Sequence, residues 1–139
     1  PILTSQPNKE NKMLANISKA FGAVLLIVGI LGFVPAFTPD GHLLGIFHVN
    51  TFHNLVHVLS GVAALAAGFS GYKYAKLYFQ VFGVVYALVA VLGVFYGNDP
   101  ILGLIAHNYA DLYLHIAIAA TALTLGFGNV VKDDHVVAA

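Results

Sequence analysis

The sequence predicts an all-α integral membrane protein: a four-helix bundle built from two repeated helical hairpins, with short interfacial helices on the outer side. Of its 139 residues, 59% are hydrophobic and only 9% are charged, whereas a soluble domain usually carries about 25% charged residues. The charges are spaced so that they separate four uncharged runs of 20, 32, 22 and 20 residues. Each run is long enough to cross a bilayer core, which takes about 20 apolar helical residues.

The uncharged runs place the elements in order along the chain. The first run follows three lysines and has no clear small-residue cleavage site, so we expect it to be retained as a membrane span. A polar N-terminal tail (1–15) and a C-terminal tail (132–139) flank the membrane domain (16–131). The predicted helices cover residues 16–35, 50–70, 75–97 and 108–130.

The lysines predict the orientation. All six fall on one side of a four-span chain, at positions 9, 12, 19, 73, 76 and 132. Because cytoplasmic loops carry an excess of Lys and Arg, both termini are expected to be cytoplasmic. We expect a bacterial inner membrane, or another energy-transducing membrane, with the two long loops facing outward.

Composition excludes several functions. There is no Cys and the formal net charge is zero. Disulfides, thiolate metal sites and iron–sulfur ligation are therefore excluded, and no basic surface is available to attract nucleic acid. The expected partners are the lipid bilayer and either a larger membrane complex or further copies of the chain.

The two halves of the chain resemble one another, repeat one covering residues 20–70 and repeat two residues 77–130. Matching residues are 61 apart in the first helix of each repeat and 58 apart after the loop. Such self-similarity predicts two copies related by a pseudo-two-fold axis along the membrane normal. In each copy a short apolar stretch with a central glycine, 43–47 or 101–105, is predicted as an interfacial helix, with Asp99 and Pro100 at the start of the second.

The repeat places polar residues at the starts of its second helices. The pattern is Asn50-x-x-His53-x-x-x-His57 in one copy and Asn108-x-x-Asp111-x-x-x-His115 in the other. Residues four apart share a helix face, so His53, His57, Asp111 and His115 can converge on the axis as a metal site. Three imidazoles and a carboxylate suit Zn, Cu or Fe. His48 and His107 flank the same helix starts as candidate outer ligands or supporting groups.

Two other interpretations of these residues remain open. Asn50 and Asn108 stand where helix N-caps are expected, and Asp111 lies in a first turn where a carboxylate is favoured; the histidines would then serve only as polar contacts between helices. Alternatively His57 and His115 are axial ligands of haem, or ligate chlorophyll, in the bundle.

The segment from Gly45 to Gly61, Gly-Ile-Phe-His-Val-Asn-x-x-His-Asn-x-x-His-x-x-x-Gly, resembles a family of small bacterial four-helix membrane proteins known only as a domain of unknown function. The resemblance covers roughly residues 19–128 and implies the membrane topology, but no activity.

The first functional hypothesis is therefore a non-enzymatic membrane protein that binds a metal ion or metallo-cofactor near the non-cytoplasmic face. The alternative is an accessory or structural subunit of a respiratory or photosynthetic complex. A metal-dependent enzyme is the third hypothesis, with Asp111 as its base. Of the remaining histidines, His42 and His135 are expected to be solvated.

Overall fold

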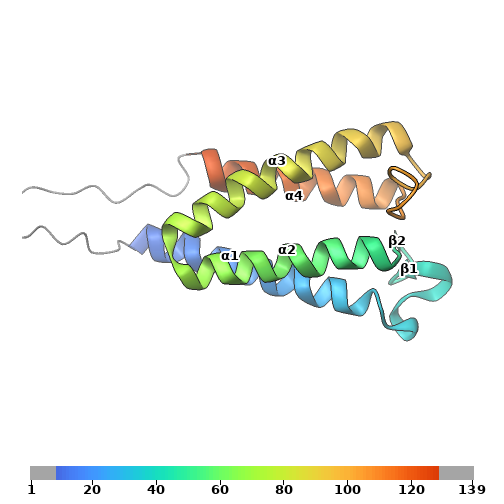
Figure 1. Cartoon of the computed structure of the whole chain (residues 1–139), viewed down its shortest axis with the longest axis horizontal. Coiled ribbons are helices and arrows are strands. Elements are labelled where there is room, and N and C mark those ends of the chain that lie inside the picture. The colour runs from blue at the N-terminus through green and yellow to red at the C-terminus, as the bar shows by residue number, and fades with distance from the viewer. Residues whose placement is uncertain (1–8, 129–139) are drawn as a thin grey trace, which may run out of the picture.

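The protein forms four long helices, as predicted. A computed structural model describes residues 9–128 and shows α1 (Lys9–Leu31), α2 (Thr51–Ser70), α3 (Tyr72–Tyr96) and α4 (Tyr109–Phe127) running along one common direction (Figure 1). Each helix is long and apolar enough to cross a membrane. The chain is thus a multi-pass membrane protein in a lipid bilayer. The predicted C-terminal tail, with Lys132 and His135, lies outside the described residues.

The helix boundaries agree with prediction except in α1, which begins at Lys9 rather than 16 and ends at Leu31 rather than 35. The early start follows from packing: Asn11 and Leu14 are buried, so this polar segment has an inward face. The early end follows from Pro35, because a residue before proline avoids the helical region. Val34 is accordingly extended, with φ −94° and ψ 114°.

The two predicted interfacial helices are wrong. Residues 43–47 belong to a small antiparallel hairpin, β1 (His42–Leu43) paired with β2 (Phe47–His48), which follows the short 3₁₀ turns η1 (Pro35–Phe37) and η2 (Pro39–Gly41). Residues 101–105 likewise form a tight turn closed by an Ile101–Ile105 bridge.

Backbone conformation explains these turns. Leu44 and Gly45 both have positive φ, 55° and 73°, as do Leu102 and Gly103, 54° and 71°. Two successive positive φ angles are the geometry of a type I′ hairpin turn, which a right-handed helix cannot contain. The central glycines therefore indicated turns, and Asp99 and Pro100 do not begin a helix.

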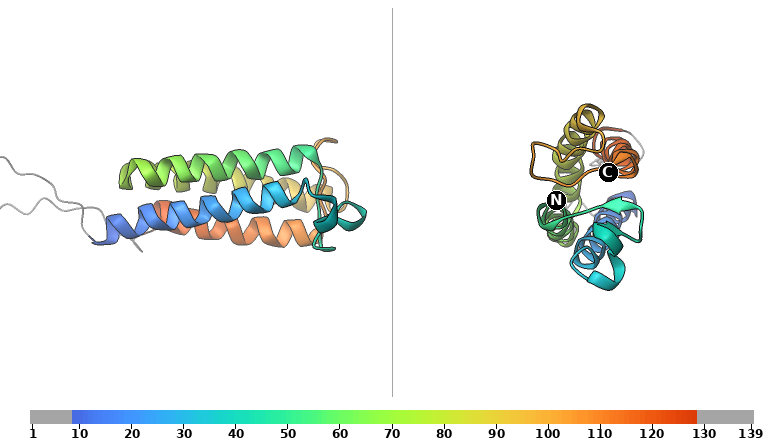
Figure 2. Two further views of the ribbon diagram at one scale, coloured as in Figure 1. Left: turned by 90° about the horizontal axis from the view of Figure 1, so that it is seen from below. Right: turned by 90° about the vertical axis from the view of Figure 1, so that its right-hand side faces the viewer.

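The helices pack as two antiparallel pairs, α1 with α2 and α3 with α4, seen along the bundle in Figure 2. Small residues allow close approach, as the sequence predicted. A Cβ atom added at Gly61 would lie 2.6 Å from the backbone nitrogen of Leu26, and one at Gly126 2.6 Å from that of Gln80. The backbones are in direct contact in both pairs.

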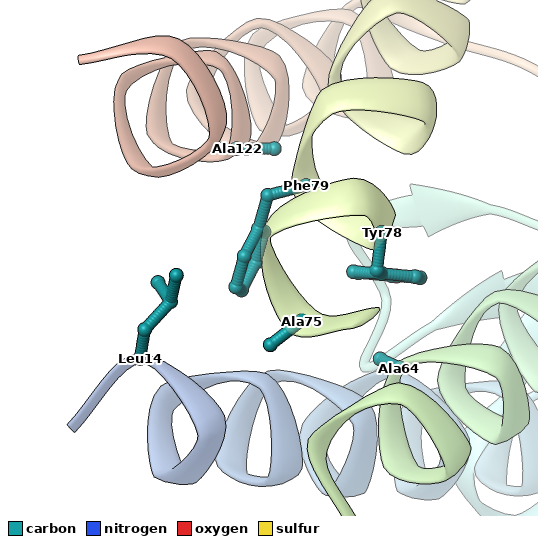
Figure 3. Close-up of a cluster of buried hydrophobic side chains, with 6 residues drawn as sticks. All are labelled: Leu14, Ala64, Ala75, Tyr78, Phe79 and Ala122. Carbon is teal, nitrogen blue, oxygen red and sulfur yellow. The ribbon is translucent and has the colours of Figure 1, made fainter. Parts of the chain in front are cut away.

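The apolar core lies toward the end of the bundle that carries the α2–α3 connection. Figure 3 shows its six buried residues around Phe79, namely Leu14, Ala64, Ala75, Tyr78, Phe79 and Ala122. We call the opposite end, which carries residues 32–50 and 97–108, the loop end. With the apolar core at one end, the loop end is free to hold buried polar residues.

Candidate metal centre

Two asparagines begin the helices that carry the site. Asn50 Oδ1 accepts the backbone N–H of His53 at 3.0 Å, and Asn108 Oδ1 accepts that of Asp111 at 2.9 Å. Asp111 also returns a bond, because its Oδ2 accepts the backbone N–H of Asn108 at 3.0 Å. The predicted caps are confirmed, and α4 has a complete capping box.

The same asparagines join the two helix pairs at the loop end. Asn50 Nδ2 donates to the backbone oxygen of Leu104, and Asn108 Nδ2 donates to that of Ile46, both at 2.8 Å. Leu104 and Ile46 occupy the same position of their respective turns. Each tight turn is thereby held against the helix start of the other pair, which fixes the separation of α2 and α4.

This frame brings together His53, His57 and His115. One ring nitrogen from each lies within 4.8 Å of the other two, so the cluster can hold a metal ion. The ring centroids are 4.8 Å apart for His53–His57, 5.7 Å for His53–His115 and 5.9 Å for His57–His115. All three side chains are at least nine-tenths buried, at 2–3% exposure.

The hydrogen bonds of His53 define its tautomer. Its Nδ1 lies 2.7 Å from the backbone oxygen of Ala106. Because a carbonyl only accepts, Nδ1 must carry the proton, which leaves the Nε2 lone pair of the neutral ring free. That Nε2 lies 2.9 Å from His57 Nε2. Without a metal His57 Nε2–H must donate to it; with a metal both lone pairs can turn to the ion.

Asp111 lies beside this cluster without completing it. Its Oδ1 is 3.8 Å from His53 Nε2, and the side chain is 1% exposed. Its other oxygen is already engaged in the capping box. Asp111 is thus placed to neutralise a cation or supply a fourth ligand through Oδ1, while the cap accounts for Oδ2.

The other predicted histidines have separate surroundings. His107 Nδ1 donates to the backbone oxygen of Gly97, and its ring lies 5.9 Å from that of His115. It therefore adjoins the cluster. His48 instead stacks on His42 across the β hairpin, with ring centroids 4.7 Å apart. His42 is partly exposed in the loop end, in agreement with the expectation that it is solvated.

Two groups around the cluster were missed by sequence reasoning. The Ala106 carbonyl orients His53, and Tyr86 has its ring 6.2 Å from that of His115. A loop carbonyl has no sequence signature. Tyr86 did have a sequence signal: it is a polar residue at the position where the first repeat has the apolar Leu25.

Several buried polar atoms around the cluster lack a partner within residues 9–128. They are His57 Nδ1, His115 Nδ1, His107 Nε2 and the Tyr86 hydroxyl. An unsatisfied buried polar group costs about 1–3 kcal/mol, and polar groups inside a membrane are costly enough to suggest a function. The cluster therefore concentrates imidazole nitrogens that can ligate a cation or form hydrogen bonds with an oxygen-bearing ligand.

Comparison with known proteins identifies the family but no activity. No curated protein and no solved structure matches the chain. A family model, described as a domain of unknown function (DUF4383), matches residues 16–128 and so spans all four helices and the histidine cluster. The chain belongs to this DUF4383 family.

Proposed function

We propose that this membrane protein binds one transition-metal ion through His53, His57 and His115, with Asp111 as the fourth ligand or counter-charge. The observation that carries the proposal is the convergence of three buried imidazole nitrogens within 4.8 Å. Tetrahedral coordination at about 2.0–2.1 Å places neighbouring nitrogens about 3.4 Å apart. The present separations run up to 4.8 Å, so the proposal requires the rings to turn toward one another when an ion binds.

The donor set narrows the choice of metal. Three imidazoles with one carboxylate suit Zn²⁺, and Cu²⁺ or Fe²⁺ where water completes the shell. Haem or chlorophyll between His57 and His115 is less well supported, because His53 Nε2 lies 2.9 Å from His57 Nε2, on the side where a macrocycle would need space. The role that follows is to hold, sense or pass on an ion within the membrane.

The second part of the proposal concerns ancestry. The matching turns, matching caps and reciprocal asparagine bonds occur at positions 58 residues apart, which supports two copies of one hairpin about a pseudo-two-fold axis. The metal then lies close to that axis. His57 and His115 are its equivalent ligands, and His53 and Asp111 its divergent ones.

Metal analysis of the purified protein tests the proposed function. The full chain, purified in mild detergent, is expected to contain about one equivalent of metal by elemental analysis, as a single structural or catalytic site would. His57→Ala and His115→Ala should each lose it. His42→Ala is the matched control, because it removes an imidazole from the loop end outside the cluster. Wild-type protein without metal, or a visible tetrapyrrole spectrum, would overturn the assignment.

Orientation is also a proposal, namely that the loop end faces away from the cytoplasm. Within the described residues the lysines lie toward the other end, at positions 9, 12, 19, 73 and 76. The chain contains no native Cys, so single cysteines can be introduced without background. Asn98→Cys, at an exposed position of the loop end, should react with a membrane-impermeant maleimide added to intact cells, and Lys73→Cys should react only after lysis. The reverse pattern would invert the topology.

A further inference from the structure

An open groove leads from the membrane to the histidine cluster between α1 and α4. Its wider part has a volume of about 360 Å³ and is lined by apolar residues of α1, including Ile17, Phe21 and Leu25, by Leu114 and Ile118 of α4, and by His57. A second compartment of about 200 Å³ continues toward the loop end. Val28, His57 and Leu114 line both compartments, so the two adjoin each other at His57.

The two compartments differ in polarity. Apart from His57, the wider one is lined entirely by apolar side chains. The second has four buried polar side chains in its wall: His53, Asn54, His57 and Asp111. Together their volumes fall within the range of about 300–1,000 Å³ typical of small-molecule sites. Such a space matches a molecule with an apolar chain and a polar head.

We propose that this groove binds a membrane-dissolved quinone or quinol, with the chain between α1 and α4 and the ring oxygens beside His57. The depth of the site excludes a charged lipid head. His57 follows the first residue of α2 by six positions, which places it about 9 Å along the helix axis. A phosphate at that depth would be strongly unfavourable, whereas a neutral oxygen-bearing ring is tolerated.

Hydrogen-bond chemistry points to the same class of ligand. His57 Nδ1 is buried and has no partner among residues 9–128. Without metal, Nε2–H donates to His53 and Nδ1 is an acceptor, which suits a hydroxyl; with metal on Nε2, Nδ1–H is a donor, which suits a carbonyl. A quinol supplies the first and a quinone the second. Because protein covers Nδ1, the side chains around it must move on binding so that Nδ1 is reached while Nε2 keeps its partner.

The equivalent groove between α2 and α3 holds a cavity of about 420 Å³, but none of the clustered histidines lines it. Ile17 and Leu25 correspond to Tyr78 and Tyr86 at the offset of 61 residues. Tyr78 donates its hydroxyl to the backbone oxygen of Ser60 at 3.0 Å, and Tyr86 is 2% exposed. Filling the open groove with the same residue is therefore a direct test of its role.

The experiment measures binding of decyl-benzoquinone to the full chain in nanodiscs, with decylbenzene as the probe that lacks oxygen. Wild type should bind the quinone saturably and roughly tenfold more tightly than decylbenzene, because decylbenzene has no oxygen to hydrogen-bond the buried imidazole. Leu25→Tyr should reduce quinone binding at least tenfold. Ile27→Tyr, the same kind of substitution on the lipid-facing side of α1, should not.

Each contrary result overturns the inference. Non-saturable quinone binding, equal binding of decylbenzene, displacement of the quinone by an equimolar fatty acid, or normal binding in Leu25→Tyr would each do so. Metal content is measured in the same samples. The groove is present without a bound ion. If quinone binding fails while metal content is normal, the metal proposal stands. If metal is absent while quinone binds, the quinone proposal stands.

Discussion

The starts of α2 and α4 share one backbone design and differ in one chemical position. Both begin at an asparagine that caps its own helix and bonds to the other pair's turn. Three residues later α2 has His53, which donates to Ala106, while α4 has Asp111, which accepts from its own cap. The shared backbone arrangement depends on the two asparagines. The residue three positions later differs between the halves: His53 is a proposed metal ligand, and Asp111 caps its own helix.

Giving α2 the same helix start as α4 should have the largest effect, which is on bound metal. His53→Asp gives α2 the Asn-x-x-Asp pattern of α4 and removes one of the three imidazoles. We expect loss of bound metal by elemental analysis and a lower unfolding temperature of the metal-free protein. A capping box is gained, but the buried Ala106 carbonyl loses its donor and a second buried carboxylate lies near Asp111. Retention of one equivalent of metal would show that His53 is not a ligand.

Removing the charge of Asp111 tests the other half of the comparison. Asp111→Asn preserves shape but removes the charge beside His53. Because groups that support a metal site typically contribute 10–100-fold to affinity, we expect metal to bind about tenfold or more weakly in a competition titration with a chelator. Asp99→Asn, at a carboxylate in the loop that follows α3, is the matched control. An unchanged affinity for Asp111→Asn would assign the carboxylate to capping alone.

The smallest effect is expected from substituting the two asparagines, and it is on the free energy of unfolding. Asn50→Ala and Asn108→Ala should each lower the free energy of unfolding by about 1–2 kcal/mol, since each loses a cap and one hydrogen bond. Asn→Asp at either position keeps the capping oxygen but loses the donated bond, so it separates the two contributions. Thermal unfolding in detergent, followed by circular dichroism, measures both. A loss confined to one asparagine would mean that the halves are not equivalent.

The two grooves between helices, α1–α4 and α2–α3, also differ at equivalent positions. Ile17 and Leu25 line a groove that reaches His57. Of the residues at the equivalent positions, Tyr78 donates to Ser60 and lines a cavity that none of the clustered histidines borders, and Tyr86 is buried beside His115. As at the helix starts, equivalent positions in the two halves carry different side chains. If the proposed metal and quinone sites are correct, these few side chains make the binding sites asymmetric within a similar backbone.

Much of the fold followed from local patterns in the sequence. The four spans depend only on run length and charge spacing, and the caps at Asn50 and Asn108 depend only on residues within one turn. For the same reason the pairing of His53 with His57 was predictable, because a spacing of four places both on one helix face. The tight turns were missed because an apolar run with a glycine fits a helix and a hairpin equally well by composition.

What the sequence by itself determined is thus the membrane bundle, its helix starts and the candidate ligands, because these properties are set by periodicity and by contacts between near neighbours. Only the tertiary structure decided which of those residues meet. The Ala106 carbonyl that orients His53 is 53 residues away. Whether a groove between helices reaches the histidine cluster depends on how α1 and α3 pack against their neighbours. Contacts between distant segments have no local signature, so neither the orientation of His53 nor the route to His57 could be predicted before the helices were placed together.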